Sequence, residues 1–206
     1  MSRRSGSPTL DLLVVFVLVY TVQSLVQLLG LVGLAGVHTF LFVLHAPSAQ
    51  PWALVTSVYA HGSLGHLLSN AVALALVGFP LERYTTRLRF HVFFVVAGAL
   101  AGYAEVLLAA GPVGVLGASG AVFALYGYVL GGNRVTDGLL ARLGLPGWVE
   151  YAAFAAIAIV VTLATGAPGV ALIAHFTGFV VGVAAGRARL LATSQRTALG
   201  SRKESY

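Results

Sequence analysis

The chain of 206 residues has no cysteine and few charged residues. Without cysteine it can form no disulfide, no thiolate metal site and no catalytic thiol. Only 9% of its residues are charged and 58% are hydrophobic, whereas about 25% of a typical soluble domain is charged. The mean hydropathy is +0.92. This composition excludes an ordinary soluble domain and indicates an integral membrane protein.

Apolar runs divide the chain into six segments that could cross a membrane, which takes about 20 residues. We therefore expect an all-α polytopic membrane protein. No Ala-x-Ala pattern follows the first segment, so we expect it to be a span and not a removable signal peptide. The region 33–60 has no charged residue but contains histidines and aromatic residues, which favours a loop. The expected spans are residues 10–32, 64–81, 90–110, 119–132, 148–165 and 170–186.

The twelve arginine and lysine residues fall in four groups. With six spans, all four groups lie on one side of the membrane, so the positive-inside rule predicts that both termini are cytoplasmic. This placement explains the net charge of +6 without a nucleic-acid partner. We expect a cytoplasmic N-terminus at 1–9, a six-span domain at 10–186 and a basic cytoplasmic tail at 187–206, in the plasma membrane. The groups are Arg3 and Arg4; Arg83, Arg87 and Arg89; Arg134 and Arg142; and five residues from Arg187 to Lys203.

The fourth segment is too short to cross the membrane. Residues 119–132 extend about 21 Å as a helix, short of a hydrocarbon core of about 30 Å. If the inner end reaches the surface, the connection 111–118 must dip into the membrane. Irregular backbone is tolerated there only where protein covers it or where it lines a water-filled cavity. Ser119 is therefore expected at the floor of a cavity that opens to the outside.

His175 lies about five residues, or roughly 7 Å, into the sixth segment, a depth comparable with that of Ser119. Ionisable side chains inside a membrane are functional-site hypotheses by default. Small residues allow close helix packing, so we expect Ser119 and His175 to meet as nucleophile and base. The alternative is that the small residues serve packing alone. They are Gly178 and Gly182 in the sixth segment, and Gly120, Ala124, Gly127 and Gly131 in the fourth.

Three groups could stabilise an oxyanion beside this pair. Ser119 begins a helix, so its N–H and the positive end of the helix dipole face developing negative charge. His66 and Asn70 share one helical face near the outer end of the second span, and both can donate hydrogen bonds. The alternative for these two is an interhelical hydrogen-bonded pair. No carboxylate is placed to orient His175, which favours a dyad over a triad.

Three further ionisable residues need an explanation. His61 could shape the loop before the second span or bind the outer carboxamide region. A metal site of His61 and His66 is disfavoured because their spacing of five suits one helical face poorly and no carboxylate accompanies them. Glu105 is the one acidic residue in the third span, either bonded to loop backbone or near the outer interface. Glu82 with Arg83 resembles an ion pair or a loop anchor. We expect no metal and no cofactor.

Three motifs, in order and together within residues 52–182, resemble those of the rhomboid intramembrane serine proteases. Such a resemblance implies a six-helix core without an added seventh span and with a half-submerged first loop. The second-span motif is His61-x4-His66-x3-Asn70 followed by Glu82; the serine motif is Gly117-Ala118-Ser119-Gly120 continuing to Phe123; the histidine motif is Ala174-His175-x2-Gly178-x3-Gly182.

The resemblance also implies an activity and its residues. Ser119 and His175 would be catalytic, and His66, Asn70 and the Ser119 amide would form the oxyanion hole. The fifth span would be a lateral gate for transmembrane protein substrates. Cleavage would fall near the outer end of a substrate's transmembrane segment, at small residues with helix-breaking residues nearby.

Two positions depart from the family pattern. Ala53 follows Trp52 where rhomboids often have an arginine that helps order the first loop. Phe123 stands where a tyrosine often packs beneath the histidine; it keeps the stacking surface but has no hydroxyl. We expect activity to survive the change at Phe123.

Two other function classes compete with an endopeptidase. A six-span transporter should show repeated halves or two interrupted helices, and the sequence shows neither. A catalytically inactive rhomboid relative that binds membrane proteins should lack the serine or the histidine, and both are present. Because His175 must be neutral to act as a base, we expect activity to fall at acidic pH.

Overall fold

The computed structural model describes residues 6–34, 36–132 and 171–192, with the single positions 149, 152, 153 and 156. The named elements within these ranges are helical, apart from one isolated bridge between Leu44 and Val115. They are α1 (Pro8–Leu28), η1 (Leu29–Val32), α2 (Gly36–Phe42), α3 (Ala53–Tyr59), α4 (Leu64–Leu81), η2 (Glu82–Tyr84), α5 (Arg87–Leu108), α6 (Ser119–Gly131) and α9 (Leu172–Arg187).

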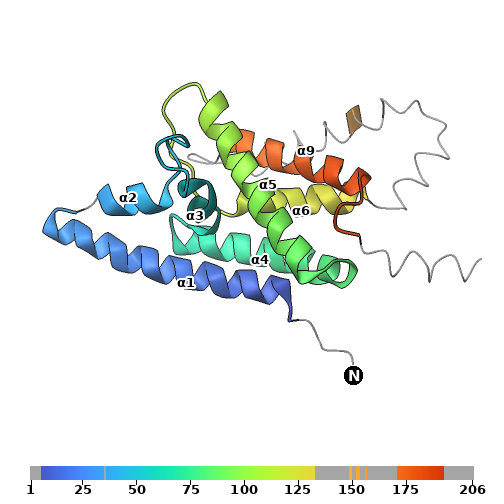
Figure 1. Cartoon of the computed structure of the whole chain (residues 1–206), viewed down its shortest axis with the longest axis horizontal. Helices are drawn as coiled ribbons and strands as arrows, with labels where there is room; N and C mark the ends of the chain where they lie inside the picture. Colours follow the sequence, from blue (N-terminus) through green and yellow to red (C-terminus); the bar gives the residue numbers. More distant parts are fainter. Residues whose placement is uncertain are drawn as a thin grey trace, which may run out of the picture.

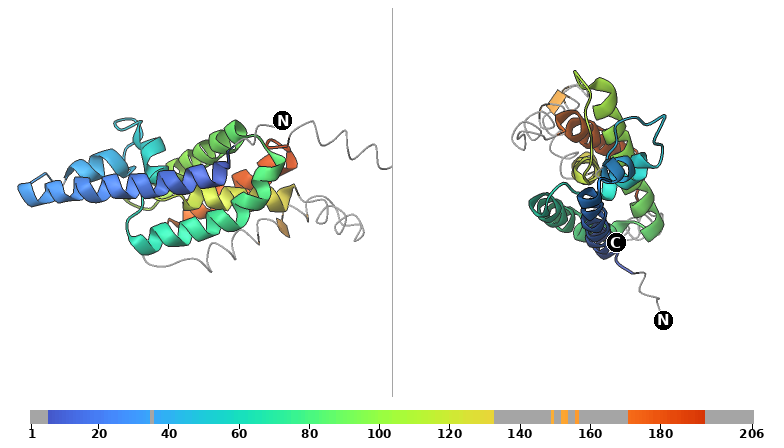
Figure 2. Two further views of the ribbon diagram at one scale, coloured as in Figure 1. Left: turned by 90° about the horizontal axis from the view of Figure 1, so that it is seen from below. Right: turned by 90° about the vertical axis from the view of Figure 1, so that its left-hand side faces the viewer.

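The long helices form a bundle in which α6 is central. Figure 1 shows α1, α4, α6 and α9 running along the long axis while α5 crosses them obliquely. The short helices α2 and α3 lie at the end of the bundle where α1 ends (Figure 1). Helix α6 contacts α4, α5 and α9, and the end-on view in Figure 2 shows it between them. This arrangement surrounds the first residues of α6 with protein.

The described helices account for most of the expected spans. Three are long and apolar enough to cross a membrane: Pro8–Val32, Leu64–Tyr84 and Arg87–Leu108. Helices α6 and α9 are apolar but shorter, with 13 and 16 residues. Apart from the single positions 149, 152, 153 and 156, the fifth expected span lies outside the described residues, and so do the arginines at 134 and 142, the first five residues and the tail beyond 192. The count of six spans therefore stays a prediction.

Polar side chains set where the helices begin. Ser7, Ser63 and Thr86 each accept a backbone N–H of the first turn, at α1, α4 and α5, and thereby satisfy donors that the helix leaves free. Helix α4 has the predicted bounds. Helix α5 begins at Arg87, three residues before the predicted start at Phe90, because the cap and not the apolar run decides the first turn.

The region 33–60 was expected to be a loop, but it contains the short helices α2 and α3. Side-chain hydrogen bonds connect the two helices. The Trp52 indole donates to the Phe40 carbonyl at 3.1 Å, and the Thr56 hydroxyl to the Leu41 carbonyl at 2.6 Å. Ala53, the residue without the family arginine, is fully buried at the start of α3. Trp52 and Thr56, close to Ala53 in the chain, thus connect α3 to α2 without an arginine at position 53.

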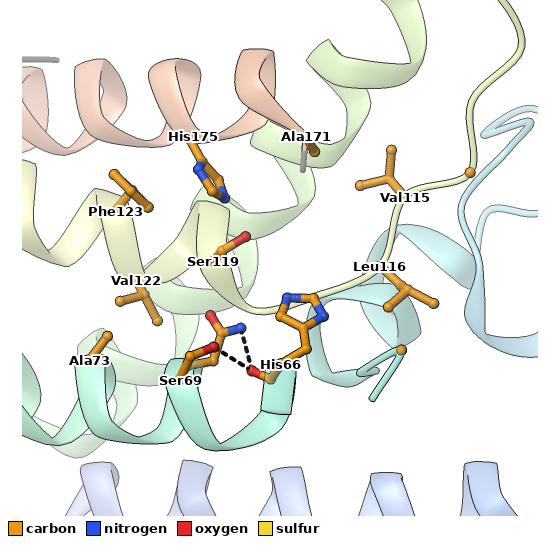
Figure 3. Close-up of a pocket in the computed structure, with 13 residues that line it drawn as sticks. His66, Ser69, Ala73, Val115, Leu116, Ser119, Val122, Phe123, Ala171 and His175 are labelled. Carbon is orange, nitrogen blue, oxygen red and sulfur yellow. Dashed lines mark hydrogen bonds between the residues drawn. The ribbon is translucent and has the colours of Figure 1, made fainter. Parts of the chain in front are cut away.

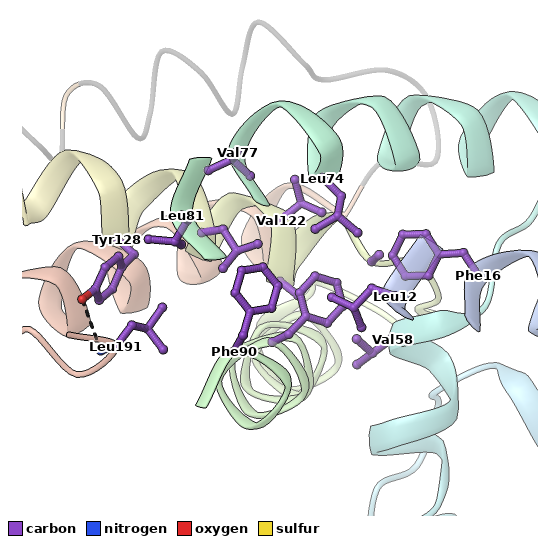
Figure 4. Close-up of a cluster of buried hydrophobic side chains, with 14 of the residues drawn as sticks. Leu12, Phe16, Val58, Leu74, Val77, Leu81, Phe90, Val122, Tyr128 and Leu191 are labelled. Atoms are coloured by element: carbon purple, nitrogen blue, oxygen red, sulfur yellow. Dashed lines mark hydrogen bonds between the residues drawn. The ribbon is translucent and has the colours of Figure 1, made fainter. Parts of the chain in front are cut away.

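A buried apolar cluster joins α1, α4, α5 and α6 (Figure 4). Polar contacts close its arginine-rich end. The Glu82 carboxylate accepts from the Ser7 hydroxyl at 2.7 Å and from the Thr9 backbone N–H at 3.1 Å. Arg87 pairs with Asp11 at 2.6 Å. Glu82 is therefore an anchor for the start of α1; the alternative of an ion pair with Arg83 is wrong, because the carboxylate turns toward α1.

Candidate active site

A cavity of about 830 Å³ lies at the start of α6, between α4, α9 and the connection 111–118. The predicted residues Ser119, His175, His66, Asn70 and Phe123 all line it. They come from three helices, so the fold brings together side chains that are up to 109 positions apart (66 to 175). The cavity is large enough for several peptide side chains together with water.

Ser119 is the first residue of α6, and neighbouring segments hold the connection before it. Leu44 and Val115 exchange two backbone hydrogen bonds of 2.9 and 3.0 Å, and the Gly117 N–H donates to the Ser57 carbonyl at 2.8 Å. Gly117 has a φ of +130°, which glycine adopts readily. A Cβ there would also lie 2.6 Å from the His66 ring. The glycine is therefore required both by the backbone angle and by the close approach of His66.

His175 is buried, with 6% of its surface exposed, in the first turn of α9. Figure 3 shows its ring pointing from α9 toward Ser119, with the His66 ring on the far side of Ser119. The Phe123 ring stacks on the imidazole at a centroid distance of 4.4 Å and an interplanar angle of 18°. As predicted, phenylalanine provides the stacking surface. The stack limits rotation of the imidazole away from Ser119.

Glycines bring the backbones of α6 and α9 into direct contact. A Cβ at Gly178 would collide with the carbonyl of Gly120, and one at Gly182 with the carbonyl of Ala124. From the other side, a Cβ at Gly127 would collide with the carbonyl of Phe179. The predicted close packing of these two helices is confirmed. It fixes the helix carrying Ser119 directly against the helix carrying His175.

His66 and Asn70 lie one turn apart on the cavity wall formed by α4. The Asn70 side-chain amide donates to the His66 carbonyl at 2.9 Å, and the Ser69 hydroxyl donates to the same carbonyl at 3.0 Å. The Asn70 bond stays within α4, so it is not the interhelical bond of the alternative interpretation. An amide nitrogen carries two hydrogens, so one remains for an acceptor in the cavity.

Glu105 reaches the helix that carries His175. Its carboxylate accepts the Ala174 backbone N–H at 2.8 Å, and its side chain is buried, with 9% of the residue exposed. Ala174 is in the first turn of α9, where backbone N–H groups lack a partner within the helix. The carboxylate from α5 thus caps α9 next to His175. An acidic residue in an apolar span was the only sequence signal for this contact.

His61 supports the site from behind without lining the cavity. Its ring donates from Nδ1 to the Tyr59 carbonyl at 3.1 Å, and its backbone N–H donates to the Gln23 side chain at 2.9 Å. Burial lowers the pKa of His61 to about 4, repulsion from His66 adds to this, and the bond to Tyr59 opposes it. His61 therefore shapes the loop as a neutral group. Within the described residues, no group of three or more metal-ligating side chains occurs.

Comparison with known proteins places these residues within a matched domain. A family model described as the Rhomboid domain matches residues 48–191. The Rhomboid protease GlpG of Pectobacterium atrosepticum is 30% identical over 143 residues, which cover 68% of this chain and 49% of that protein.

Two further relatives differ in how much of the chain they match. The Rhomboid protease GlpG of Salmonella choleraesuis is 27% identical over 213 residues, covering 96% of this chain and 68% of that protein. The human Rhomboid-related protein 3 is 39% identical over 77 residues, covering 37% of this chain and 19% of that protein. The chain thus spans about a fifth of the human protein and about half of the Pectobacterium protein.

Proposed function

The chain belongs to the rhomboid family of integral membrane proteins, and from this premise we propose that it is an intramembrane serine endopeptidase. Ser119 is the nucleophile and His175 the general base. The observation that carries this proposal is that both side chains face one cavity from two helices whose backbones touch (Figure 3). A hydroxyl needs such an adjacent base because it is a weak nucleophile at its ordinary pKa.

The proposed reaction passes through an acyl-enzyme. His175 accepts the Ser119 proton while Oγ attacks the scissile carbonyl, and the oxyanion is bound by the Ser119 N–H with His66 and Asn70. The imidazolium then protonates the leaving amine, and the C–N bond breaks. Water in the cavity gives its proton to His175 and attacks the ester, which releases the carboxylic acid and restores the Ser119 hydroxyl.

The proposed substrates are transmembrane segments of other proteins, cut near their outer ends. Residues of α4 and of the connection 111–118 line the cavity together with Ser119, and we expect a substrate to unwind locally to present a carbonyl to Ser119. Small residues at the scissile bond and helix-breaking residues nearby would make this easier. The proposed lateral gate, residues 148–165, lies outside the described helices.

The proposed setting is the plasma membrane, with both termini in the cytoplasm. The described arginines support this orientation: Arg83, Arg87 and Arg89 lie where α4 ends and α5 begins, and Arg187 and Arg189 lie where α9 ends. The excess of arginine on one side is the signal that sets orientation. In this proposal residues 10–186 form the catalytic domain, between a short N-terminal segment (1–9) and a basic tail (187–206).

A fluorophosphonate probe tests the proposal directly, because it labels only activated serines. Detergent-solubilised protein should be labelled, and both Ser119→Ala and His175→Ala should lose the label. Ser69→Ala is the matched control, since Ser69 also lines the cavity but bonds to the His66 carbonyl. It should keep the label. Folded wild-type protein without label would overturn the proposal and favour an inactive rhomboid relative that binds membrane proteins.

A further inference from the structure

A second cavity, which shares no lining residue with the first, lies between α5 and α9. It has a volume of about 450 Å³ and is lined only by apolar residues, from Phe93–Leu100 on α5 and Val181–Leu190 at the end of α9. Ala97, Ala184 and Ala188 line it, so their short side chains leave a groove between the two helices. We call it the α5–α9 groove. Its volume is within the range of ligand sites, about 300–1,000 Å³.

The groove lies at the depth of one membrane leaflet. Its α5 side extends from Phe93 to Leu100, or about 10 Å, compared with about 15 Å for half of the hydrocarbon core. It begins four residues after Arg89, near the arginine-rich end of the bundle. Val96 and Leu100 expose 51% and 47% of their surfaces. The groove is therefore open to lipid, in the cytoplasmic leaflet under the orientation proposed above.

Two arginines lie together at the end of the groove. Arg89 is one helical turn before Phe93, and Arg189 lies between the lining residues Ala188 and Leu190. The Arg89 guanidinium donates to the Ala192 carbonyl, in the same turn as Arg189. The Tyr128 hydroxyl of α6 contacts the same turn. That hydroxyl accepts the Leu191 N–H (Figure 4). Two arginines, one on α5 and one in the turn after α9, therefore lie at the same end of an apolar groove.

Arg189 has an unusual backbone conformation. Its φ is +52°, and it is the only non-glycine residue with a positive φ in the described part of the chain. The Leu190 N–H donates to the Ala185 carbonyl and the Arg189 N–H to the Gly186 carbonyl, as in the helix ending where glycine is usual. An arginine there strains the backbone. Strain of this kind is typical of functional positions, and here it occurs at an arginine whose two neighbours in the chain, Ala188 and Leu190, line the groove.

We propose that the α5–α9 groove binds one anionic phospholipid, with an acyl chain between the helices and its phosphate against Arg89 and Arg189. An apolar groove with a pair of guanidinium groups at the headgroup end matches both parts of this molecule. Arginine binds phosphate through paired, charge-assisted hydrogen bonds. A second copy of the chain is disfavoured as the occupant, because it would bring its own arginines to the same end.

Native mass spectrometry of the full chain in detergent tests this, with phosphatidylglycerol and chain-matched phosphatidylcholine as the two probes. We expect one phosphatidylglycerol per chain to be retained at least tenfold more than phosphatidylcholine. Arg89→Gln should lose this preference. Arg83→Gln is the matched control, because Arg83 is an exposed arginine at the same end of the bundle but lies in η2, not one turn before a lining residue of the groove. It should keep the preference.

Arg189→Gly separates lipid binding from folding. Glycine suits the positive φ, so this variant should melt at the same temperature as the wild type or higher without lipid, yet lose the retained phosphatidylglycerol. If Arg189→Gly still retains phosphatidylglycerol like the wild type, the proposal is overturned.

Ala184→Phe tests the acyl-chain part, because it fills the groove and leaves both arginines in place. It should lose the retained lipid. The control Val180→Phe enlarges an exposed α9 side chain outside the groove and should retain it. Equal retention of the two phospholipids, or a dimer that Ala184→Phe dissociates, would contradict the proposal. None of these measurements depends on protease activity.

Discussion

The two walls of the active-site cavity are built differently. The wall formed by α6 and α9 carries Ser119 and His175, and its glycines place one helix backbone directly on the other. The wall formed by α4 carries His66 and Asn70, and it meets α6 through side chains: a hydrogen bond of 3.1 Å from the Tyr126 hydroxyl to the Ala73 carbonyl, and apolar contacts within the core cluster.

This difference separates the proposed nucleophile and base, on the α6–α9 wall, from the proposed oxyanion donors on the α4 wall. Backbone contact leaves no side chains to rearrange, so the relative position of the proposed nucleophile and base is fixed to within small displacements. Side-chain contact lets α4 shift when its neighbours change. We expect changes in the α6–α9 wall to abolish activity together with the fold around it, and changes in the α4 wall to slow the reaction while the bundle stays intact.

The largest combined effect on rate and stability is expected from Gly182→Ala. Even one methyl group at this position would collide with the Ala124 carbonyl, so α6 and α9 must separate. A displacement of about 1 Å can cost about 100-fold in rate, and overpacking costs about 1–3 kcal/mol in stability. Fluorophosphonate labelling rates and thermal melting should both fall.

The matched control for this variant is Gly65→Ala on α4. A Cβ there would lie 3.9 Å from the Ser63 hydroxyl, an ordinary contact. This variant should label and melt like the wild type. If both variants behave alike, the two walls do not differ as described.

A smaller effect on stability, with a comparable or larger loss of rate, is expected from Asn70→Ala in the α4 wall. Loss of one oxyanion donor costs about 100- to 1,000-fold in kcat, while removal of a hydrogen bond inside α4 costs about 1 kcal/mol of stability. Cleavage of a transmembrane substrate measures the loss in kcat, and thermal melting measures the loss in stability. A large fall in the melting temperature without a specific fall in kcat would assign Asn70 to structure only.

Glu105 tests whether the first turn of α9, in the α6–α9 wall, must be held in place for activity. Glu105→Leu removes the acceptor for the Ala174 N–H and should cost about 1 kcal/mol, the typical value of a helix cap. We expect about a tenfold lower labelling rate, because the first turn of α9 carries His175. Glu105→Gln retains an acceptor oxygen and should recover most of the rate. Equal rates for the two variants would argue against a positioning role.

The smallest effect on activity is expected from His61→Gln, because His61 lies behind the α4 wall and does not line the cavity. Its effect should appear in the pH dependence of stability. Its pKa is about 4 in the folded protein and 6.5 ordinarily, so the unfolded chain binds a proton first as the pH falls. The free energy of unfolding should therefore decrease between about pH 6.5 and pH 4. The melting temperature of His61→Gln should therefore depend less on pH across this range than that of the wild type. At pH 7 the group is neutral in both states and this contribution to pH dependence vanishes.

Much of the fold and the site could be read from local patterns. The bounds of α4 and the start of α6 follow from apolar runs with a serine cap or a glycine-rich break. The serine and histidine motifs placed Ser119 and His175 at similar depths, and the glycine spacing predicted that their helices touch. These features depend on residues within a few turns of one another, where periodicity and hydropathy carry the information.

The sequence by itself determined the membrane class, most of the helical segments and the choice of candidate site residues, because these depend on composition and short-range spacing. Only the tertiary structure decided the partners of Glu105 and Glu82, the helices within 33–60, and the meeting of Arg89 with Arg189. These are contacts between segments far apart in the chain. Which segments meet depends on how whole helices pack, and no local pattern in the sequence specifies that.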